Sequence, residues 1–106
     1  GVMGMNACSV FVADPDVKTV TERDLCDHVD HIRSLVGDGH VGFGFDFCDE
    51  MRDFAAPGPH REYDCIKGYG ASVEFTAELL RRGYGEDVVR SIMGGSFLAF
   101  LKQTIG

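Results

Sequence analysis

The stretch "HVGFGFDFCDE", residues 40–50, is apolar, is broken by glycines and turns acidic at Asp46. It predicts a buried strand over about residues 40–47, because nearly continuous apolar sequence is typical of parallel strands that are covered on both faces. Gly42 and Gly44 would thin this strand and allow a neighbouring element to approach closely. Asp46 then lies at the carboxyl end of the strand, which is where parallel α/β folds collect their chemistry.

The elements before this strand indicate an alternation of strand and helix. Residues 2–12 form another apolar run, which predicts a buried strand leading into a loop. Thr21 is a suitable N-cap, and apolar residues then recur at helical spacing up to Gly37. These signals predict a helix over about 21–36 and, with the strands, a parallel α/β arrangement.

The second half of the chain begins with a long polar connection. Residues 49–70 have no clear period, and a connection of that length is usually functional or disordered. Ser72 is placed to cap a following helix, and a last helix is expected over residues 85–105, with a kink at Gly94 and Gly95. Six apolar residues of the last helix are expected to share one face: Val89, Ile92, Met93, Phe97, Phe100 and Leu101.

Composition narrows the class of protein. The chain has 106 residues and is 44% hydrophobic, which suits one small folded domain without internal boundaries. Its net charge is −7, and without a basic stripe we expect no nucleic-acid partner. No apolar run reaches the roughly 18 residues of a membrane span, and residues 1–12 lack the charged leader of a signal peptide.

The cysteines carry a further expectation about the compartment. Cys8, Cys26, Cys48 and Cys65 do not form a C-x-x-C pair, which argues against a zinc ribbon. Buried or partly buried free thiols are the simpler interpretation, and they favour a reducing compartment such as the cytoplasm.

A parallel sheet of only two strands is too small to close into a barrel or to be covered on both faces. Either the chain pairs with copies of itself, for example as a homodimer, or it is one piece of a larger barrel or open sheet.

The strand-end position gives Asp46 two interpretations. A carboxylate at that place can bind a metal or accept a proton from a metal-bound water. It can also cap the next loop or pair with a lysine or arginine, which is common for aspartates at strand ends. The residues alone leave both open.

Other polar residues have competing interpretations. His28 and His31, with Asp24 and Asp27, share a helix face, but they lie away from the strand end, and metal coordination normally needs three or four converging ligands. We therefore expect structural or surface histidines there. His60, in the long connection, is more simply an exposed loop residue than a substrate contact.

Two ordered motifs resemble a known family. "DLCDHVDHIRSLVGDGHVGFGFDF", residues 24–47, is followed by "AELLRRGYGEDVVRSIMGGSFLAFLK", residues 77–102. The series resembles the C-terminal third of the membrane dipeptidase family, the renal dipeptidase-like peptidases, which are similar to the amidohydrolases. The resemblance covers nearly the whole chain and is weakest over residues 49–70.

This resemblance implies a fold, a reaction and partners. The family has a (β/α)8 barrel with two zinc ions that hydrolyses dipeptides. Residues 1–106 would then be the C-terminal part of the barrel, its last two βα units and a terminal helix, with no separate domain. The substrate would be a dipeptide, and the remainder of the barrel, in the same or a separate chain, would be the partner. The family's zinc ligands come from earlier strands, so no metal ligand is expected in this chain.

Three residues take roles from the resemblance. Asp46 matches the family's strand-eight aspartate, which is implied to take and return the proton of the bridging water. Asn6 matches an asparagine at the end of the preceding strand, and we expect it to line the substrate site. Cys48 and Asp49 stand where the family has an acidic residue and a glycine. Asp49 is therefore a candidate contact with substrate in a narrower site, and a solvated residue at the start of the loop is the simpler interpretation.

A non-catalytic hypothesis stands beside the enzymatic one. The chain could be an α/β association module that lacks a metal centre and pairs through exposed strand edges. The presence or absence of the family's ligands upstream would decide between the two.

Overall fold

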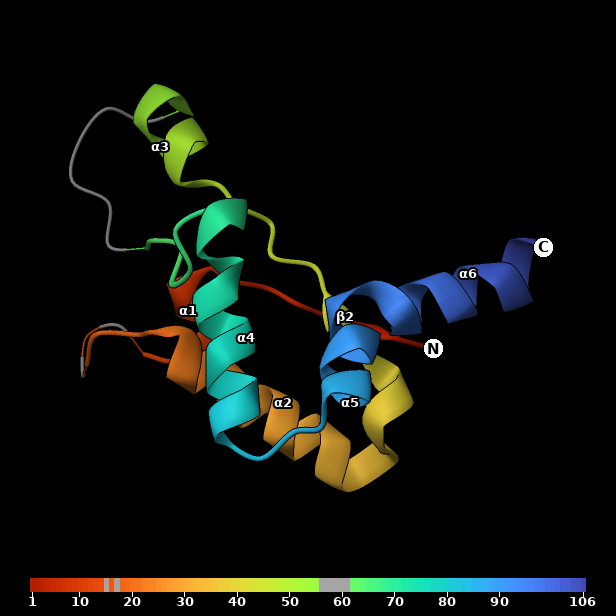
Figure 1. The fold of residues 1–106 in the computed structure, drawn as a ribbon. Helices are drawn as coiled ribbons and strands as arrows, with labels where there is room; N and C mark the ends of the chain where they lie inside the picture. Colours follow the sequence, from red (N-terminus) through yellow and green to blue (C-terminus); the bar gives the residue numbers. More distant parts are fainter. Residues whose placement is uncertain (15, 17, 56–61) are drawn as a thin grey trace.

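The computed structural model describes residues 1–14, 16, 18–55 and 62–106. They form a mixed α/β arrangement that contains a two-stranded parallel sheet, β1 (Met3–Met5) and β2 (Val41–Phe43) (Figure 1). The predicted parallel pair is confirmed, although both strands are shorter than predicted. Among the described residues only these two strands form a sheet, so the barrel implied by the resemblance goes beyond this structure.

Backbone pairing continues past the ends of the two strands. Gly44 N donates to Met5 O at 3.3 Å, and Ala7 N donates to Phe45 O at 2.8 Å. The two segments that follow the strands therefore stay side by side up to the residues that precede Asp46.

The predicted strand over residues 2–12 is wrong beyond its first half. A short helix, α1 (Ser9–Val12), replaces its end. The reason is non-local: Cys8 pairs with Asp64 in an isolated antiparallel bridge, which redirects the chain away from the sheet. An apolar run of this length does not by itself distinguish a strand from a short helix.

The predicted first long helix is confirmed as α2 (Glu22–Val36). Thr21 caps it through a capping box, in which the Thr21 side chain accepts from Arg23 N and the Asp24 carboxylate accepts from Thr21 N at 2.9 Å. Gly37 follows with φ of 88°, a left-handed conformation that glycine adopts without steric cost. A short 3-10 segment, η1 (Asp38–His40), then leads into β2.

The long connection is more ordered than the sequence predicts. It contains a helix, α3 (Asp49–Ala55), and it ends in a 3-10 turn, η2 (Tyr69–Ala71). The prediction of a connection without secondary structure over residues 49–70 is therefore wrong in part. His60 lies outside the described residues.

The helices of the second half follow the prediction with two corrections. Helix α4 (Ser72–Arg81) begins at Ser72 itself, and its N-cap residue Ala71 makes no side-chain cap, so the predicted Ser72 cap is wrong. The last helical region is divided into α5 (Glu86–Arg90), a π segment η3 (Ser91–Gly95) and α6 (Ser96–Ile105).

The predicted kink is confirmed, since Gly94 has the non-helical dihedrals φ 167° and ψ −24°. The single apolar face predicted for this region is consequently wrong. Val89 and Ile92 are buried before the kink, whereas Phe100 and Leu101 are exposed after it. Figure 1 shows α6 projecting away from α2 and α4, with the C-terminus at its tip.

The strand glycines admit an aromatic ring from α6. A Cβ added to Gly42 would lie 2.5 Å from the Phe97 ring, and one added to Gly4 would lie 3.3 Å from it. The expected close approach at Gly42 is thus confirmed. The largest fully buried side chains lie in the adjoining core: Phe75, Leu25, Ile66, Leu79, Ile92, Val20, Val29 and Val41.

Candidate functional site

The two strands bring Asn6 and Asp46 together at one edge of the sheet. Asn6 directly follows β1, and Asp46 lies three residues after the end of β2. Because the strands are parallel, their carboxyl ends meet at the same edge, and Asn6 Nδ2 donates to Asp46 Oδ2 at 3.2 Å. We call these two residues the strand-edge pair.

The orientation of the Asn6 amide follows from its second contact. Cys8 N donates to Asn6 Oδ1 at 2.8 Å. A backbone N–H is a donor only, so the amide oxygen must face Cys8 and the amide nitrogen must face Asp46. Asn6 is therefore connected at both ends.

Asp46 itself has an uncommon backbone conformation. Its φ is 55°, and it is the only non-glycine residue of the described part of the chain with a positive φ. Aspartate and asparagine occupy this left-handed region more readily than other side chains. The turn ends the extended segment after β2, and the Asp46 side chain lies exposed at the sheet edge.

Cys48 lies beside Asp46 but is a poor nucleophile in this place. Its Sγ is 3.0 Å from Asp46 O and 3.7 Å from Asp46 Oδ1. Desolvation, followed by the negative charge of Asp46, raises the pKa of the Cys48 thiol. A raised pKa keeps the thiol protonated, and the thiolate is the reactive form.

A buried carboxylate, Asp64, fixes the segment that follows Asp46. It is 2% exposed, and its Oδ2 accepts from Cys48 N at 2.8 Å and from Asp49 N at 2.9 Å. Its Oδ1 accepts from Arg52 Nη2 at 3.1 Å. Asp64 thus satisfies amides at the start of α3 from 15 residues further along the chain. We call Asp64 with Cys48, Asp49 and Arg52 the Asp64 anchor.

Sequence reasoning missed Asp64, because nothing in its local pattern distinguishes it from other polar residues of the connection. It did single out Asp49, which lies in the same anchor. The Asp49 carboxylate accepts from Asp64 N at 2.8 Å and from Lys67 Nζ at 2.9 Å, and it pairs with Arg52. Burial acts to raise the pKa of Asp49, but Lys67 and the Asp64 amide outweigh it and hold that pKa below its usual value.

A pocket of about 610 Å³ lies next to the anchor. Its lining residues are Phe47, Asp49, Glu50, Met51, Asp64, Lys67, Gly68 and Tyr69. Phe47 and Tyr69 meet edge to face in its wall, with ring centroids 4.9 Å apart. The predicted contact between Asp49 and substrate stays a prediction, in a place where Asp49 already has protein partners.

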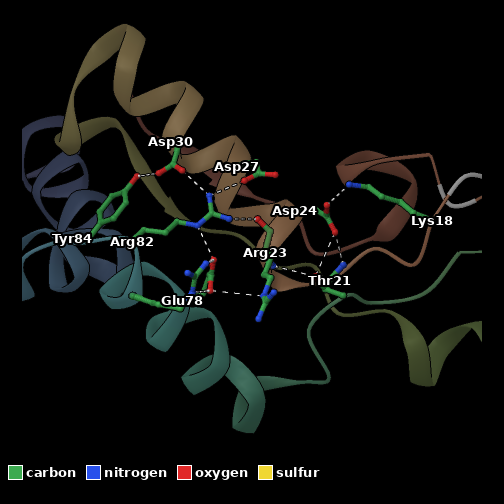
Figure 2. A network of polar contacts seen from close by, with 10 residues as sticks. Lys18, Thr21, Arg23, Asp24, Asp27, Asp30, Glu78, Arg82 and Tyr84 are labelled. Atoms are coloured by element: carbon green, nitrogen blue, oxygen red, sulfur yellow. Dashed lines mark hydrogen bonds and ion pairs between the residues drawn. The ribbon is translucent and has the colours of Figure 1, made fainter.

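The acidic face of α2 is occupied by structural contacts (Figure 2). Arg82 Nη1 donates to Asp27 at 2.7 Å and to Asp30 at 2.6 Å, and Arg82 Nε donates to Glu78 at 2.8 Å. Tyr84 completes the set by donating to Asp30. We call these residues the α2–α4 network, since they join α2 to Glu78 of α4 and to Arg82 and Tyr84, which follow α4.

The histidines of this face are placed as surface or structural residues. His28 Nε2 lies 2.7 Å from Val12 O, and His31 is exposed. Over residues 1–14, 16, 18–55 and 62–106, no three His, Cys, Asp or Glu side chains are grouped so that they could hold a metal ion. All four cysteines are free, with Cys8 and Cys26 buried.

The comparison with protein families decides what kind of chain this is. The family model described as "Membrane dipeptidase (Peptidase family M19)" matches residues 1–105.

The chain belongs to the membrane dipeptidase family.

One relative within the membrane dipeptidases is Dipeptidase 3 of Rattus norvegicus, which is 32% identical over 101 residues. The match covers 95% of this chain and 17% of the rat protein, so the chain spans a small part of that relative's length. No solved structure matches the chain. In the part of this membrane dipeptidase segment that the structure describes, every helix is too short or too polar to cross a membrane.

Proposed function

We propose that this chain is the C-terminal portion of a metal-dependent dipeptidase and that Asp46 moves the proton in peptide hydrolysis. The family match over residues 1–105 supports the reaction class. The observation that carries the residue assignment is the strand-edge pair. An exposed carboxylate with a single amide donor lies at the carboxyl edge of a parallel sheet, where α/β folds collect their chemistry.

The geometry of Asp46 suits a proton acceptor. One hydrogen bond from Asn6 occupies Oδ2, and an ionised carboxylate still has acceptor capacity on both oxygens. Asp46 would take a proton from the water that attacks the peptide carbonyl and would return it to the amine as the C–N bond breaks. The carboxylate is regenerated in each turnover.

The zinc ions of the family would be bound by residues outside this chain. Within the described residues the donor set does not fit a metal ion, since no three suitable side chains converge. Asp46 has an amide and a thiol as its side-chain neighbours, and neither completes a zinc site with it.

The remainder of a (β/α)8 barrel is the proposed partner, in the same or a separate chain. It would cover apolar surface that this segment leaves open: a groove of about 610 Å³ lined by Gly1, Val2, Met3, Ile32, Leu35, Val36 and His40. Leu98 and Ile105 on α6 are likewise exposed. A barrel needs about 250 residues, so an active native protein of only 11.6 kDa would contradict this proposal.

The decisive experiment is Asp46→Asn in the full-length protein, assayed with a panel of dipeptides. Asparagine has nearly the same shape and tolerates the left-handed backbone, so the fold should be retained while the proton acceptor is lost. We expect kcat to fall by roughly 10³-fold, within the range for a general acid–base group. Asp87→Asn, an exposed aspartate on α5, is the matched control. Undiminished turnover by Asp46→Asn would reject the assignment.

A further inference from the structure

We propose that Asn6 is a positioning residue that orients the Asp46 carboxylate and determines which of its oxygens takes the proton. This inference rests on the proposed function of Asp46. It gives Asn6 a task different from the expected contact with substrate, because its amide nitrogen is directed at Asp46.

The argument begins with how firmly Asn6 is held. Its Oδ1 accepts from Cys8 N at 2.8 Å, and the backbone around Cys8 is itself anchored. Cys65 N donates to Ala7 O and Ser9 N donates to Tyr63 O, both at 2.8 Å. The amide group thus has one fixed orientation, and Nδ2 is presented to the sheet edge.

The two oxygens of Asp46 have unequal surroundings. Oδ2 accepts from Asn6 Nδ2 at 3.2 Å, while the one contact of Oδ1 within the described residues is the Cys48 thiol, with Sγ at 3.7 Å. An N–H···O bond to a carboxylate is stronger than a contact from a weak thiol donor. Asn6 therefore holds Oδ2, and Oδ1 is the oxygen with more acceptor capacity left for the proton.

The Asp64 anchor restrains the residues that follow Asp46 in the sequence. Asp64 binds the amides of Cys48 and Asp49, which limits how far the turn at Asp46 can relax. Asn6 would then control the remaining freedom, rotation of the Asp46 side chain. A group that transfers a proton has to be held within hydrogen-bond reach of it, so this rotation matters for turnover.

Two substitutions at Asn6 in the full-length protein separate positioning from a structural role. Asn6→Asp keeps an acceptor for Cys8 N but replaces the donor to Asp46 with a second carboxylate. Asn6→Ala removes both contacts. If Asn6 positions Asp46, Asn6→Asp should lower kcat by about tenfold or more with a near-native Tm, and Asn6→Ala should lower kcat less and reduce Tm. A merely structural role predicts the opposite order.

The pH profile and a structure supply independent readouts. A like charge beside Asp46 disfavours its ionised form, so the acid limb of kcat against pH should move up by about one unit in Asn6→Asp. Within the part of the chain that the structure describes, the titratable side chain in contact with Asp46 is the Cys48 thiol, and Asn6→Asp does not replace it. In a crystal structure of full-length Asn6→Ala, the Asp46 side chain should turn or adopt more than one conformer. Tyr84→Phe, which removes a hydrogen bond in the α2–α4 network, is the control and should leave the profile in place.

The outcomes distinguish this inference from the proposed function. Native kcat and acid limb in Asn6→Asp, with Asp46→Asn inactive, would overturn the role of Asn6 alone. A rise in KM with unchanged kcat would also overturn it and would favour direct substrate contact. Native turnover in Asp46→Asn would overturn both.

Discussion

Asp46 and Glu78 are carboxylates of one small molecule in opposite surroundings. Asp46 is exposed and, among the residues that the structure describes, has one amide donor, at 3.2 Å. Glu78 is 5% exposed and receives two N–H groups from Arg81, at 2.7 and 2.6 Å, and one from Arg82 at 2.8 Å. The two carboxylates therefore differ in how many partners fix them: Asp46 is left open to further partners, whereas Glu78 is fixed by two arginines at the C-terminal end of α4.

The same contrast explains why acidic residues are a weak guide to function in this sequence. The chain has 17 of them, and the densest group in the α2–α4 network is the group already paired with arginine. The strand-edge pair is sparse by comparison, and its place at the ends of two parallel strands is what distinguishes it.

Asp46→Asn should have the largest effect on turnover. The next largest effect that tests the comparison of Asp46 with Glu78 is a loss of stability in Arg82→Met. Arg82 is 17% exposed and pairs with the buried Glu78 and with the more exposed Asp27 and Asp30, so its loss leaves the Glu78 carboxylate buried with less compensation. We expect a loss of about 3 kcal/mol in the free energy of unfolding, with kcat per folded molecule unchanged. Urea unfolding of the full-length protein, beside its turnover, measures both.

The exposed pair Arg90 and Glu86 offers the matched control, since removing a solvent-exposed ion pair should change stability little. A loss of turnover in Arg82→Met without a loss of stability would break the division between the two regions.

Local signals allowed the sequence to predict one set of features. Helix α2 is specified by its own Thr21 cap, its apolar spacing and Gly37. The family resemblance, and not a local pattern, placed Asn6 at the end of a strand, and the parallel pairing in the structure then explains why Asn6 and Asp46 meet at one edge. These features depend on residues close in sequence or on a general rule of topology.

Non-local contacts explain the features that the sequence did not reveal. Helix α3 is only seven residues long, and the start of the helix is held by Asp64, 15 residues away from Asp49. The α2–α4 network joins Arg82 to Asp27 across 55 residues. No periodicity or spacing within a short window contains such pairings.

An intermediate effect is expected from Asp64→Asn. This change keeps the shape of a buried side chain but weakens its bond to Arg52 and presents an N–H₂ group toward backbone donors. We expect a loss of about 2 kcal/mol in the free energy of unfolding, typical of a hydrogen bond to a charged group. Because the anchor also restrains the turn at Asp46, kcat should fall several-fold as well.

Thermal unfolding and kcat, measured on the same Asp64→Asn preparation, show whether stability and turnover fall together. Asp38→Asn, at a partly exposed aspartate paired with Arg33, is a control for loss of an acidic group outside the anchor. A stability loss with fully native kcat would show that the anchor and the strand-edge pair are independent, and it would sharpen the comparison into two unconnected regions.

The smallest expected effect is on stability at acid pH and comes from Glu78. Hydrogen bonds from Arg81 and then Arg82 lower the pKa of Glu78 to about 2 from an ordinary value of 4.5. Between pH 2 and 4.5 the unfolded chain therefore binds a proton at Glu78 while the folded chain does not, so the free energy of unfolding rises with pH in this window. The contribution is fully present above about pH 4.5 and is lost as the pH falls toward 2.

Glu78→Gln should consequently flatten the acid end of the stability curve. The Tm difference between the native protein and this variant should be greatest near neutral pH and should shrink between pH 4.5 and 2. Glu74→Gln, an exposed position on the same helix, controls for the loss of one acidic residue. A Tm difference that stays constant across this window would mean that Glu78 contributes by packing rather than by its charge, and the contrast with Asp46 would then rest on burial alone.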